Sequence, residues 1–230
     1  MPENSLVPAV EDRIGAWVEF QRLQRIQKRK EKEGFTITIS RTFGCEGYVL
    51  AEALKKQLES ETGKTWTIFD KALIDKINSE HSLSKNLLEN LGGQSTFVDE
   101  IVAGLSEHWK SERDTFRLMA KTIYSIANEG NAIIVGRGAA LISKSLKNAY
   151  HFRLEAPLQF RIAKFASRAR LTSEEAKEIV VKKEHQRNKF FESFLNQDIA
   201  NSENYHAIFN NKKCHVEGIA STISHYIKSV

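Results

Sequence analysis

Five short runs rich in β-branched and aromatic residues alternate with longer helical stretches from Phe35 to the end of the sequence. The runs are FTITIS (35–40), TWTIFD (65–70), NAIIVG (131–136), AYHFRL (149–154) and YHAIFN (205–210). They are mostly apolar and do not alternate cleanly with polar residues, which is typical of parallel strands covered on both faces. The sequence therefore predicts an α/β fold in which right-handed helical crossovers connect an open parallel sheet.

The longest stretch between two predicted strands, residues 71–130, is rich in helical patterns. Its apolar residues include Leu87, Leu88, Leu91, Phe116, Met119, Ile123 and Ile126, and Gly92-Gly93 interrupts the pattern. We expect helices that rise beside the sheet and cap one side of a cleft.

The composition narrows the class of protein and its ligands. The chain has 230 residues, of which 41% are hydrophobic and 27% charged, as in a soluble globular protein. It has no run of about eighteen apolar residues and no secretory-signal pattern at the N-terminus, so we expect no membrane span and no export. Only two cysteines occur, Cys45 and Cys214, which favours a reducing, cytoplasmic location. The net charge of +5 suits polyanionic ligands but is too small to indicate nucleic acid, and the seven histidines show no metal-ligand spacing.

Residues 1–33 are predicted to form an amphipathic helical extension, and residues 34–230 the main domain. Apolar residues recur every three or four positions at Val10, Ile14, Trp17, Phe20, Leu23 and Ile26. We expect this helix to pack on the main domain or on a second subunit, which would form a homodimer. Contact with a membrane surface or with nucleic acid is the alternative, because its second half is basic. That half has no aromatic residue to stack on bases, so nucleic acid is the weaker option.

Ligands of open α/β sheets bind at the carboxyl ends of the strands, so the residues that follow each strand are candidates for a site. After the first strand, residues 40–47 lead into a predicted helix, whose exposed N–H groups favour an anion. The second strand ends in Asp70. The third ends in Arg137 between two glycines, which permit a sharp turn and leave the guanidinium free. The basic residues after the fourth strand are Arg161, Lys164 and Arg168, on one helix face, and later Arg187.

Positive groups from separate segments therefore meet at one edge of the predicted sheet. Phosphoryl transfer needs such a cluster, because charge spreads over the oxygens of the transferred phosphate. Each residue also has a structural interpretation. Asp70 suits the N-cap of the next helix, Gly44 and Gly47 suit a turn, and the basic stripe suits a solvated face.

The motifs in this order resemble the cytidylate kinase-like family, a branch of the P-loop nucleoside monophosphate kinases. They are ITISRTFGCEG, FDKALIDKI, IIVGRGA, HFRLEAPLQFRI and QRNKFFESFLNQDIANSENYHAIFN, within residues 35–226. The resemblance implies a three-layer P-loop kinase-like fold with a five-stranded parallel sheet, a helical insert for the nucleoside monophosphate and a lid. It also implies transfer of the γ-phosphate of ATP, with Mg2+, to a (d)CMP-like acceptor.

The same resemblance implies roles for individual residues. The loop that binds ATP corresponds to Ser40, Arg41, Thr42, Phe43, Gly44, Cys45, Glu46, Gly47 and Tyr48. Asp70 and Arg137 correspond to residues that bind the acceptor. The catalytic arginines correspond to Arg137, Arg161, Arg168 and Arg187.

The loop departs from the pattern of active kinases. A standard loop, GxxGxGK, has a lysine where this chain has Gly47. The cytidylate kinase-like branch, SRxxGSGGR, has a glycine and an arginine where this chain has Glu46 and Tyr48. A carboxylate beside a polyphosphate is unfavourable unless Mg2+ or an arginine neutralises it, and we expect Arg41 to replace the missing lysine. Cys45 either is a reactive thiol at a helix N-terminus or fills the serine position of the loop.

Two functions fit these observations. One is a nucleoside monophosphate kinase-like phosphotransferase, which the arginines favour. The other is a non-catalytic P-loop protein that binds a nucleotide or another phosphorylated ligand and acts through a partner. The absent lysine and Glu46 favour this second function.

Overall fold

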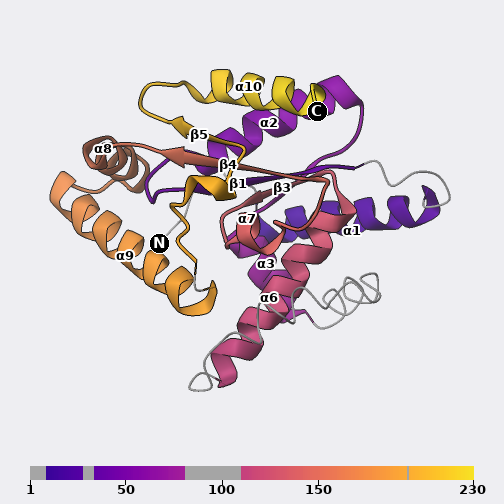
Figure 1. Cartoon of the computed structure of the whole chain (residues 1–230), viewed down its shortest axis with the longest axis horizontal. Helices are drawn as coiled ribbons and strands as arrows, with labels where there is room; N and C mark the ends of the chain where they lie inside the picture. Colours follow the sequence, from indigo (N-terminus) through magenta and orange to yellow (C-terminus); the bar gives the residue numbers. More distant parts are fainter. Residues whose placement is uncertain (1–8, 28–33, 81–109, 196) are drawn as a thin grey trace.

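The computed structural model describes residues 9–27, 34–80, 110–195 and 197–230. Five parallel strands form one sheet in the order β2-β3-β1-β4-β5 (Figure 1). Their bounds are β1 Thr36–Arg41, β2 Thr67–Phe69, β3 Ala132–Val135, β4 Ala149–Glu155 and β5 Ala207–Asn210. Each strand overlaps the run that predicts it, so the predicted parallel sheet is confirmed.

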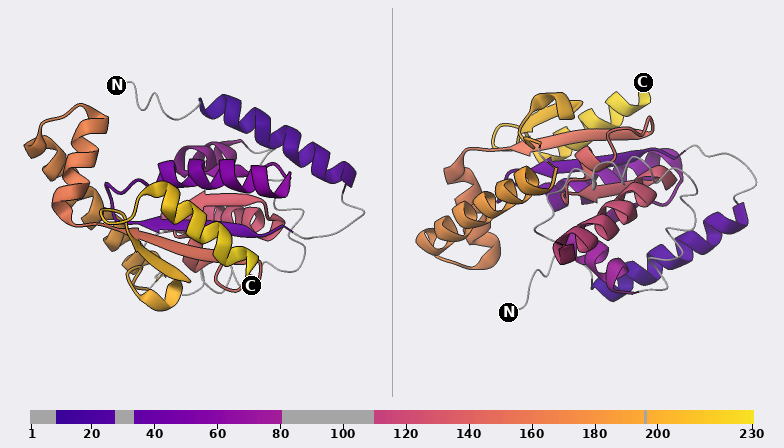
Figure 2. Two further views of the ribbon diagram at one scale, coloured as in Figure 1. Left: turned by 90° about the horizontal axis from the view of Figure 1, so that it is seen from above. Right: turned by 60° about the horizontal axis from the view of Figure 1, so that its bottom comes forward.

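Helices lie on both faces of the sheet and at one end of it. They are α1 Val10–Gln27, α2 Gly47–Thr62, α3 Lys71–Ser79, α6 Lys110–Glu129, α7 Ala139–Ile142, α8 Leu158–Ala169, α9 Ser173–Leu195 and α10 Val216–Lys228, with a 3-10 turn at Ser202–Asn204. Helices α2 and α10 cover one face, and α1, α3, α6 and α7 lie on the other (Figure 1). Helices α8 and α9 stand at the end toward which the β4 arrow points (Figures 1 and 2).

Part of the predicted helical insert falls outside the described residues. This part includes Leu87, Leu88, Leu91 and the break at Gly92-Gly93. Helices α3 and α6, on either side of it, pack on the sheet as expected.

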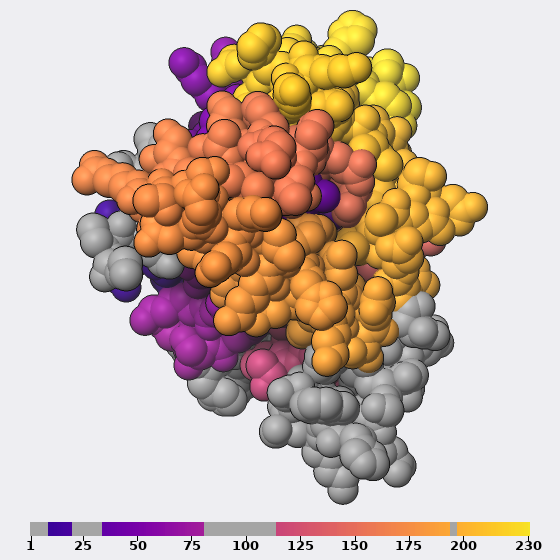
Figure 3. Space-filling model, turned by 90° about the vertical axis from the view of Figure 1, so that its left-hand side faces the viewer, coloured from indigo at the N-terminus to yellow at the C-terminus, as the bar shows by residue number. Residues whose placement is uncertain are grey.

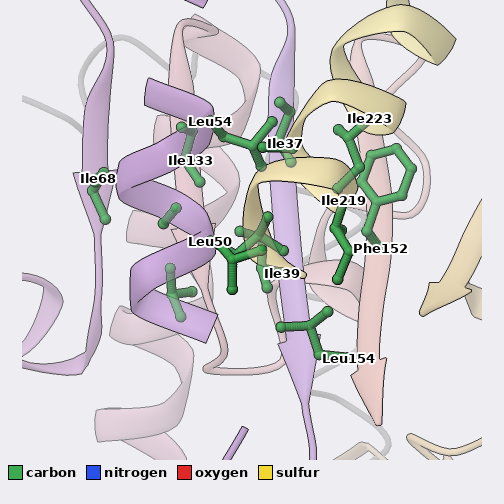
Figure 4. Close-up of a cluster of buried hydrophobic side chains, with 14 of the residues drawn as sticks. Ile37, Ile39, Leu50, Leu54, Ile68, Ile133, Phe152, Leu154, Ile219 and Ile223 are labelled. Atoms are coloured by element: carbon green, nitrogen blue, oxygen red, sulfur yellow. The ribbon is translucent and has the colours of Figure 1, made fainter. Parts of the chain in front are cut away.

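Strand residues point alternately into two hydrophobic cores, which makes the three layers. Ile133 and Val135 of β3 join the core under α2 and α10, whereas Ala132 and Ile134 join the core under α3 and α6. The first core is drawn in Figure 4, where Leu50 and Leu54 of α2 face the strands. This alternation is the two-residue period of a β-strand.

The central strand β1 is buried on both faces, but one face is polar. Ile37 and Ile39 are fully buried, while Thr36, Thr38 and Ser40 point to the other side. Each hydroxyl has a partner: the carbonyl of Ala127 at 2.9 Å, His151 Nδ1 at 2.9 Å and the hydroxyl of Tyr205 at 3.1 Å, respectively. Buried polar groups need such partners, since an unpaired one is destabilising.

Helix α1 packs on the main body beside α3. Trp17 is 3% exposed and its ring lies edge-on to Phe69, with 5.8 Å between the ring centroids. Ile14 packs against the same core. Within the four described ranges, none of the helices combines the length and the apolar character needed to cross a membrane.

Candidate functional site

The loop between β1 and α2, residues 42–46, lies at the carboxyl edge of the sheet. Its turn depends on Gly44, whose φ is +97° and where an added Cβ would lie 2.7 Å from the Cβ of Arg161. Only glycine permits both this backbone conformation and this close approach of α8. The N–H groups of Gly44 and Gly47 have no acceptor among the described residues. These groups, at the N-terminus of α2, can donate hydrogen bonds to an anion.

Arg41, the last residue of β1, extends its side chain across the loop toward the end of β3. An added Cβ would lie 3.1 Å from its Cδ if placed on Gly47 and 1.8 Å from its Nη1 if placed on Gly136. Burial, together with the nearby charge of Arg187, lowers the pKa of the Arg41 guanidinium from 12.5 to about 10. The guanidinium donates no hydrogen bond to any residue that the structure describes. It is therefore a partly buried cation with unused donors beside the loop.

The turn after β3 places three successive residues in the left-handed region. The φ values of Gly136, Arg137 and Gly138 are 80°, 56° and 71°. This conformation is unfavourable for an arginine, by about 1–2 kcal/mol. Arg137 forms an ion pair with Asp75 of α3, and its Nε is buried without a partner in the described chain. Backbone strain and an unsatisfied buried donor are both typical of functional sites.

Arginines of α8 and α9 donate hydrogen bonds to backbone carbonyl oxygens of the loop. Arg161 donates to Phe43 at 2.9 Å, Arg168 to Gly44 at 3.2 Å, and Arg187 to Arg41. The structure thus brings these three predicted catalytic residues to the loop. It also shows that carbonyl oxygens already occupy part of their donor capacity.

Two further contacts hold α8 and α9 on the loop. The backbone N–H of Phe43 donates to Oε2 of Glu184 at 2.5 Å, and Arg187 donates to Oε1 of the same carboxylate at 2.6 Å. The Phe43 ring packs on Phe165, with 5.3 Å between centroids. It joins a small hydrophobic cluster that includes Ile162, Ala176 and Val180. Seen from the left-hand side of Figure 1, α8 and α9 (orange) cover much of the molecule (Figure 3).

The carboxylate of Glu46 is held on the side of α8 and β5. Lys164 Nζ lies 2.9 Å from its Oε1, and Asn211 Nδ2 donates to its Oε2 at 3.3 Å. The backbone N–H of Glu46 in turn donates to Oδ1 of Asn211 at 2.8 Å. Among the described residues, the cation that pairs with Glu46 is therefore a lysine and not an arginine.

The small polar residues of the loop have structural partners. The hydroxyl of Ser40 accepts a hydrogen bond from Tyr205, and Thr42 Oγ1 lies 3.1 Å from Cys45 Sγ. Cys45 is 5% exposed, and burial raises the pKa of its thiol. A raised pKa disfavours the thiolate, which favours the hypothesis that Cys45 fills the serine position of the loop.

Asp70 lies at the end of β2, beside the first turn of α2. It is the N-cap of α3, since its carboxylate accepts from the N–H of Leu73 at 3.0 Å, so its structural interpretation is confirmed. Arg13 of α1 also pairs with this carboxylate, at 2.9 Å, and its guanidinium carbon lies 5.7 Å from the ring centroid of Tyr48. The charge of Asp70 raises the pKa of both Arg41 and Arg137 against the lowering effect of burial. These groups therefore form one electrostatic cluster with the loop.

A metal ion bound by the described residues would need further ligands, such as water or substrate oxygens. Among the described residues, no group of three histidine, cysteine, aspartate or glutamate side chains could hold one. Mg2+ at phosphoryl-transfer sites is typically held by one or two carboxylates together with substrate phosphates.

A model of the cytidylate kinase-like family matches residues 36–213. The chain belongs to the cytidylate kinase-like family. The matched range contains all five strands and excludes α1. Together with the parallel sheet and its helical layers, membership of the cytidylate kinase-like family confirms the predicted P-loop kinase-like fold.

Solved structures include similar folds. An uncharacterized protein from Eubacterium ventriosum ATCC 27560 has a TM-score of 0.68 at 17% identity, over 86% of this chain and 100% of that one. For shikimate kinase from Bacteroides thetaiotaomicron the TM-score is 0.47 at 12% identity, over 84% and 98% of the two chains. For dephospho-CoA kinase from Campylobacter jejuni it is 0.34 at 13% identity, over 84% and 97%. The first likeness shows a shared fold alone. A comparison with curated proteins gives no match.

Some residues of this cytidylate kinase-like site are absent from the sequence-based prediction. Asn211 directly follows the fifth strand, so the rule that strand ends carry the site would have found it. Glu184 stands three residues before Arg187 on α9, a spacing that indicates an ion pair on one helix face. Arg13 lies outside the matched range, and no local pattern indicates that it pairs with Asp70.

Proposed function

We propose that this member of the cytidylate kinase-like family is a nucleotide phosphotransferase that uses ATP and Mg2+ to phosphorylate a (d)CMP-like nucleoside monophosphate. One observation carries the proposal. The unused donors of Arg41, Gly44 and Gly47 lie together where β1 and β3 end and α2 begins. Such a cluster fits phosphate oxygens, which need several donors and positive charge at once.

The residues on the nucleotide side suit a polyphosphate. The N–H groups of Gly44 and Gly47, at the start of α2, would bind phosphate oxygens, aided by the helix dipole. Arg41 would supply the charge of the missing lysine, because a guanidinium binds phosphate in a bidentate manner. ATP would supply the transferable phosphate, and Mg2+ would neutralise part of its negative charge.

The residues on the acceptor side suit a monophosphate. Arg137 has a buried Nε without a partner among the described residues, and it stands on a turn that directs it across the end of the sheet toward α3. We propose that it binds the acceptor phosphate, with Asp70 nearby for the nucleoside. Arg161, Arg168 and Arg187 would neutralise the transferred group after they leave the loop carbonyls.

A phosphoryl-transfer screen tests the proposal. Purified protein is incubated with ATP and each nucleoside monophosphate, with and without Mg2+, and diphosphate products are separated by chromatography. We expect a diphosphate from CMP or dCMP that needs Mg2+. Arg137→Ala should abolish the product, whereas Lys177→Ala, an exposed change on α9, should not.

A second function is favoured by a specific observation. The loop lacks a lysine, and its carbonyl oxygens already accept hydrogen bonds from Arg161, Arg168 and Arg187. A non-catalytic P-loop protein, which binds a phosphorylated ligand and acts through a partner, would be consistent with this. Binding of ATP without any diphosphate product in the screen would support this second function.

A further inference from the structure

The carboxylate of Glu184 lies on the phosphate loop in a position that an anionic ligand could take. It accepts from the N–H of Phe43 at 2.5 Å and from Arg187 at 2.6 Å, and its Oε2 is 3.6 Å from Arg161. The side chain is only 19% exposed. One backbone N–H and two guanidinium groups therefore surround this carboxylate.

The same set of donors would bind a phosphate group. Carboxylates and phosphates both accept short, charge-assisted hydrogen bonds from arginine and from N–H groups near a helix N-terminus. The donors of Arg187 support a larger anion than a carboxylate. Its Nε is buried and has no partner in the described chain, although Glu184 accepts a hydrogen bond from its Nη2. At least one donor of the set, Arg187 Nε, is thus left unused by the carboxylate.

We infer that Glu184 is an internal competitor that occupies an anion site on the loop, so that a polyphosphate ligand must displace it. This inference rests on the proposed function only in that the ligand is a polyphosphate. Displacement would release Arg161 and Arg187 from the carboxylate and make them available to the ligand. The free energy needed to displace Glu184 therefore lowers the affinity of the protein for the ligand.

The competition also links the ligand to the position of α8 and α9. Phe43 donates its N–H to Glu184 and packs its ring on Phe165, so the loop holds α9 through the carboxylate and α8 through the ring. A ligand that replaces the carboxylate removes one of these two contacts. Because such coupling is reciprocal, the factor by which the Glu184 contact weakens anion binding is also the factor by which a bound anion weakens that contact.

The test measures binding of inorganic tripolyphosphate to the full chain by calorimetry, without Mg2+. Glu184→Gln removes the charge, while Glu184→Asp keeps the charge but is too short to reach the N–H of Phe43. Glu178→Gln makes the same charge change at an exposed position of the same helix. We expect Glu184→Gln to bind roughly tenfold tighter than the parent or more, as a lost charged hydrogen bond predicts. Glu184→Asp should bind tighter as well, and Glu178→Gln should match the parent.

Two results would overturn the inference. Parent-like affinity of Glu184→Asp, with tighter binding by Glu184→Gln alone, would mean that the charge acts only through space. Failure of every variant to bind tripolyphosphate would mean that the loop has no anion site. The phosphoryl-transfer screen separates this outcome from that of the proposed function. If the Glu184 variants bind tripolyphosphate more tightly but the screen gives no diphosphate, Glu184 is a competitor and the kinase proposal is wrong. If the screen gives a diphosphate but the Glu184 variants bind tripolyphosphate as the parent does, the kinase proposal stands and the competition is wrong.

Discussion

Arg13 of α1 donates hydrogen bonds to both carboxylate oxygens of Asp70, at 2.9 and 3.2 Å, and so ties the N-terminal helix to the end of β2. The two side chains are 10% and 20% exposed, so solvent screens the pair only in part. We expect Arg13→Ala to lower the free energy of unfolding by about 1–2 kcal/mol, because it leaves a carboxylate partly buried and unpaired. Urea denaturation measures this change.

An exposed ion pair on the next helix provides the control. Lys71 pairs with Asp75 at 2.9 Å but is 73% exposed. Lys71→Ala should lower the free energy of unfolding by less than about 0.5 kcal/mol. Equal effects of the two changes would contradict a structural role of Arg13.

The domain boundary at Gly34 and a homodimer through α1 stay predictions.

Arg137 allows ligand binding and backbone strain to be separated. If it binds the acceptor phosphate, Arg137→Ala and Arg137→Gly should both weaken CMP binding by about 1.5–3 kcal/mol. Their stabilities should differ, because φ is 56° at this position and only glycine adopts it freely. We expect Arg137→Gly to be more stable than Arg137→Ala by about 1 kcal/mol. CMP affinity that is unchanged in both variants would remove the binding role.

Gly136 should tolerate no side chain. An added Cβ would lie 1.8 Å from Nη1 of Arg41, and φ is +80°. Gly136→Ala must therefore displace the guanidinium and strain the turn. We expect a loss of stability of about 1–3 kcal/mol together with loss of ATP binding. Gly218→Ala is the matched change, because nothing lies within 4 Å of its added Cβ in α10, and it should raise stability by about 0.5–1 kcal/mol. A stable Gly136→Ala variant that still binds ATP would show that ATP binding does not require the close contact between Arg41 and Gly136.

Much of the fold could be predicted from the sequence, because each strand carries its own signal. The runs of apolar residues predicted the strand positions, and the rule for ligands of open sheets pointed to the edge where the loop and the arginines lie together. The face of β1 that carries Thr36, Thr38 and Ser40 was harder to interpret. A polar face usually indicates solvent, and here hydrogen bonds to distant residues allow it to be buried.

The contacts that define the site could be predicted less well. The sequence indicated that basic residues gather at the loop, and Arg161, Arg168 and Arg187 do reach it. It gave no indication that they would bond to carbonyl oxygens or that Glu184 would accept from Phe43, 141 residues away in sequence. Such pairs depend on how α8 and α9 pack, and tertiary packing leaves no local pattern.

His151 should make the stability of the protein sensitive to pH. It is 5% exposed, and burial together with the charges of His206 and Lys144 lowers the pKa of its imidazole from 6.5 to about 4. The unfolded chain therefore takes up a proton first as the pH falls. The stability contribution is complete above pH 6.5 and is lost between pH 6.5 and pH 4, by roughly 3 kcal/mol. Urea denaturation at pH 7, 6, 5 and 4 measures the loss.

A matched pair of variants assigns this loss to one side chain. His151→Asn keeps a polar atom near Thr38, whose Oγ1 lies 2.9 Å from Nδ1 of the histidine. This change should make the free energy of unfolding nearly independent of pH above pH 4.5. His185→Asn removes an exposed histidine of α9 and should leave the slope as it is in the parent. If the slope survives in His151→Asn, another group is responsible for it.

Arg41 should stabilise the liganded protein and destabilise the free one. Its guanidinium is partly buried and makes no hydrogen bond within the described chain, and its pKa is lowered to about 10. A cation of this kind is retained at a net cost unless an anion completes its contacts. We expect Arg41→Met, which keeps an unbranched side chain without the charge, to raise the free energy of unfolding without ligand by about 1–2 kcal/mol. The same variant should lose binding of ATP with Mg2+ in calorimetry. Lys177→Met, on the exposed side of α9, should change neither measurement by more than about 0.5 kcal/mol. A less stable Arg41→Met that still binds ATP would mean that the arginine only supports the turn, and that nothing replaces the missing lysine of the loop.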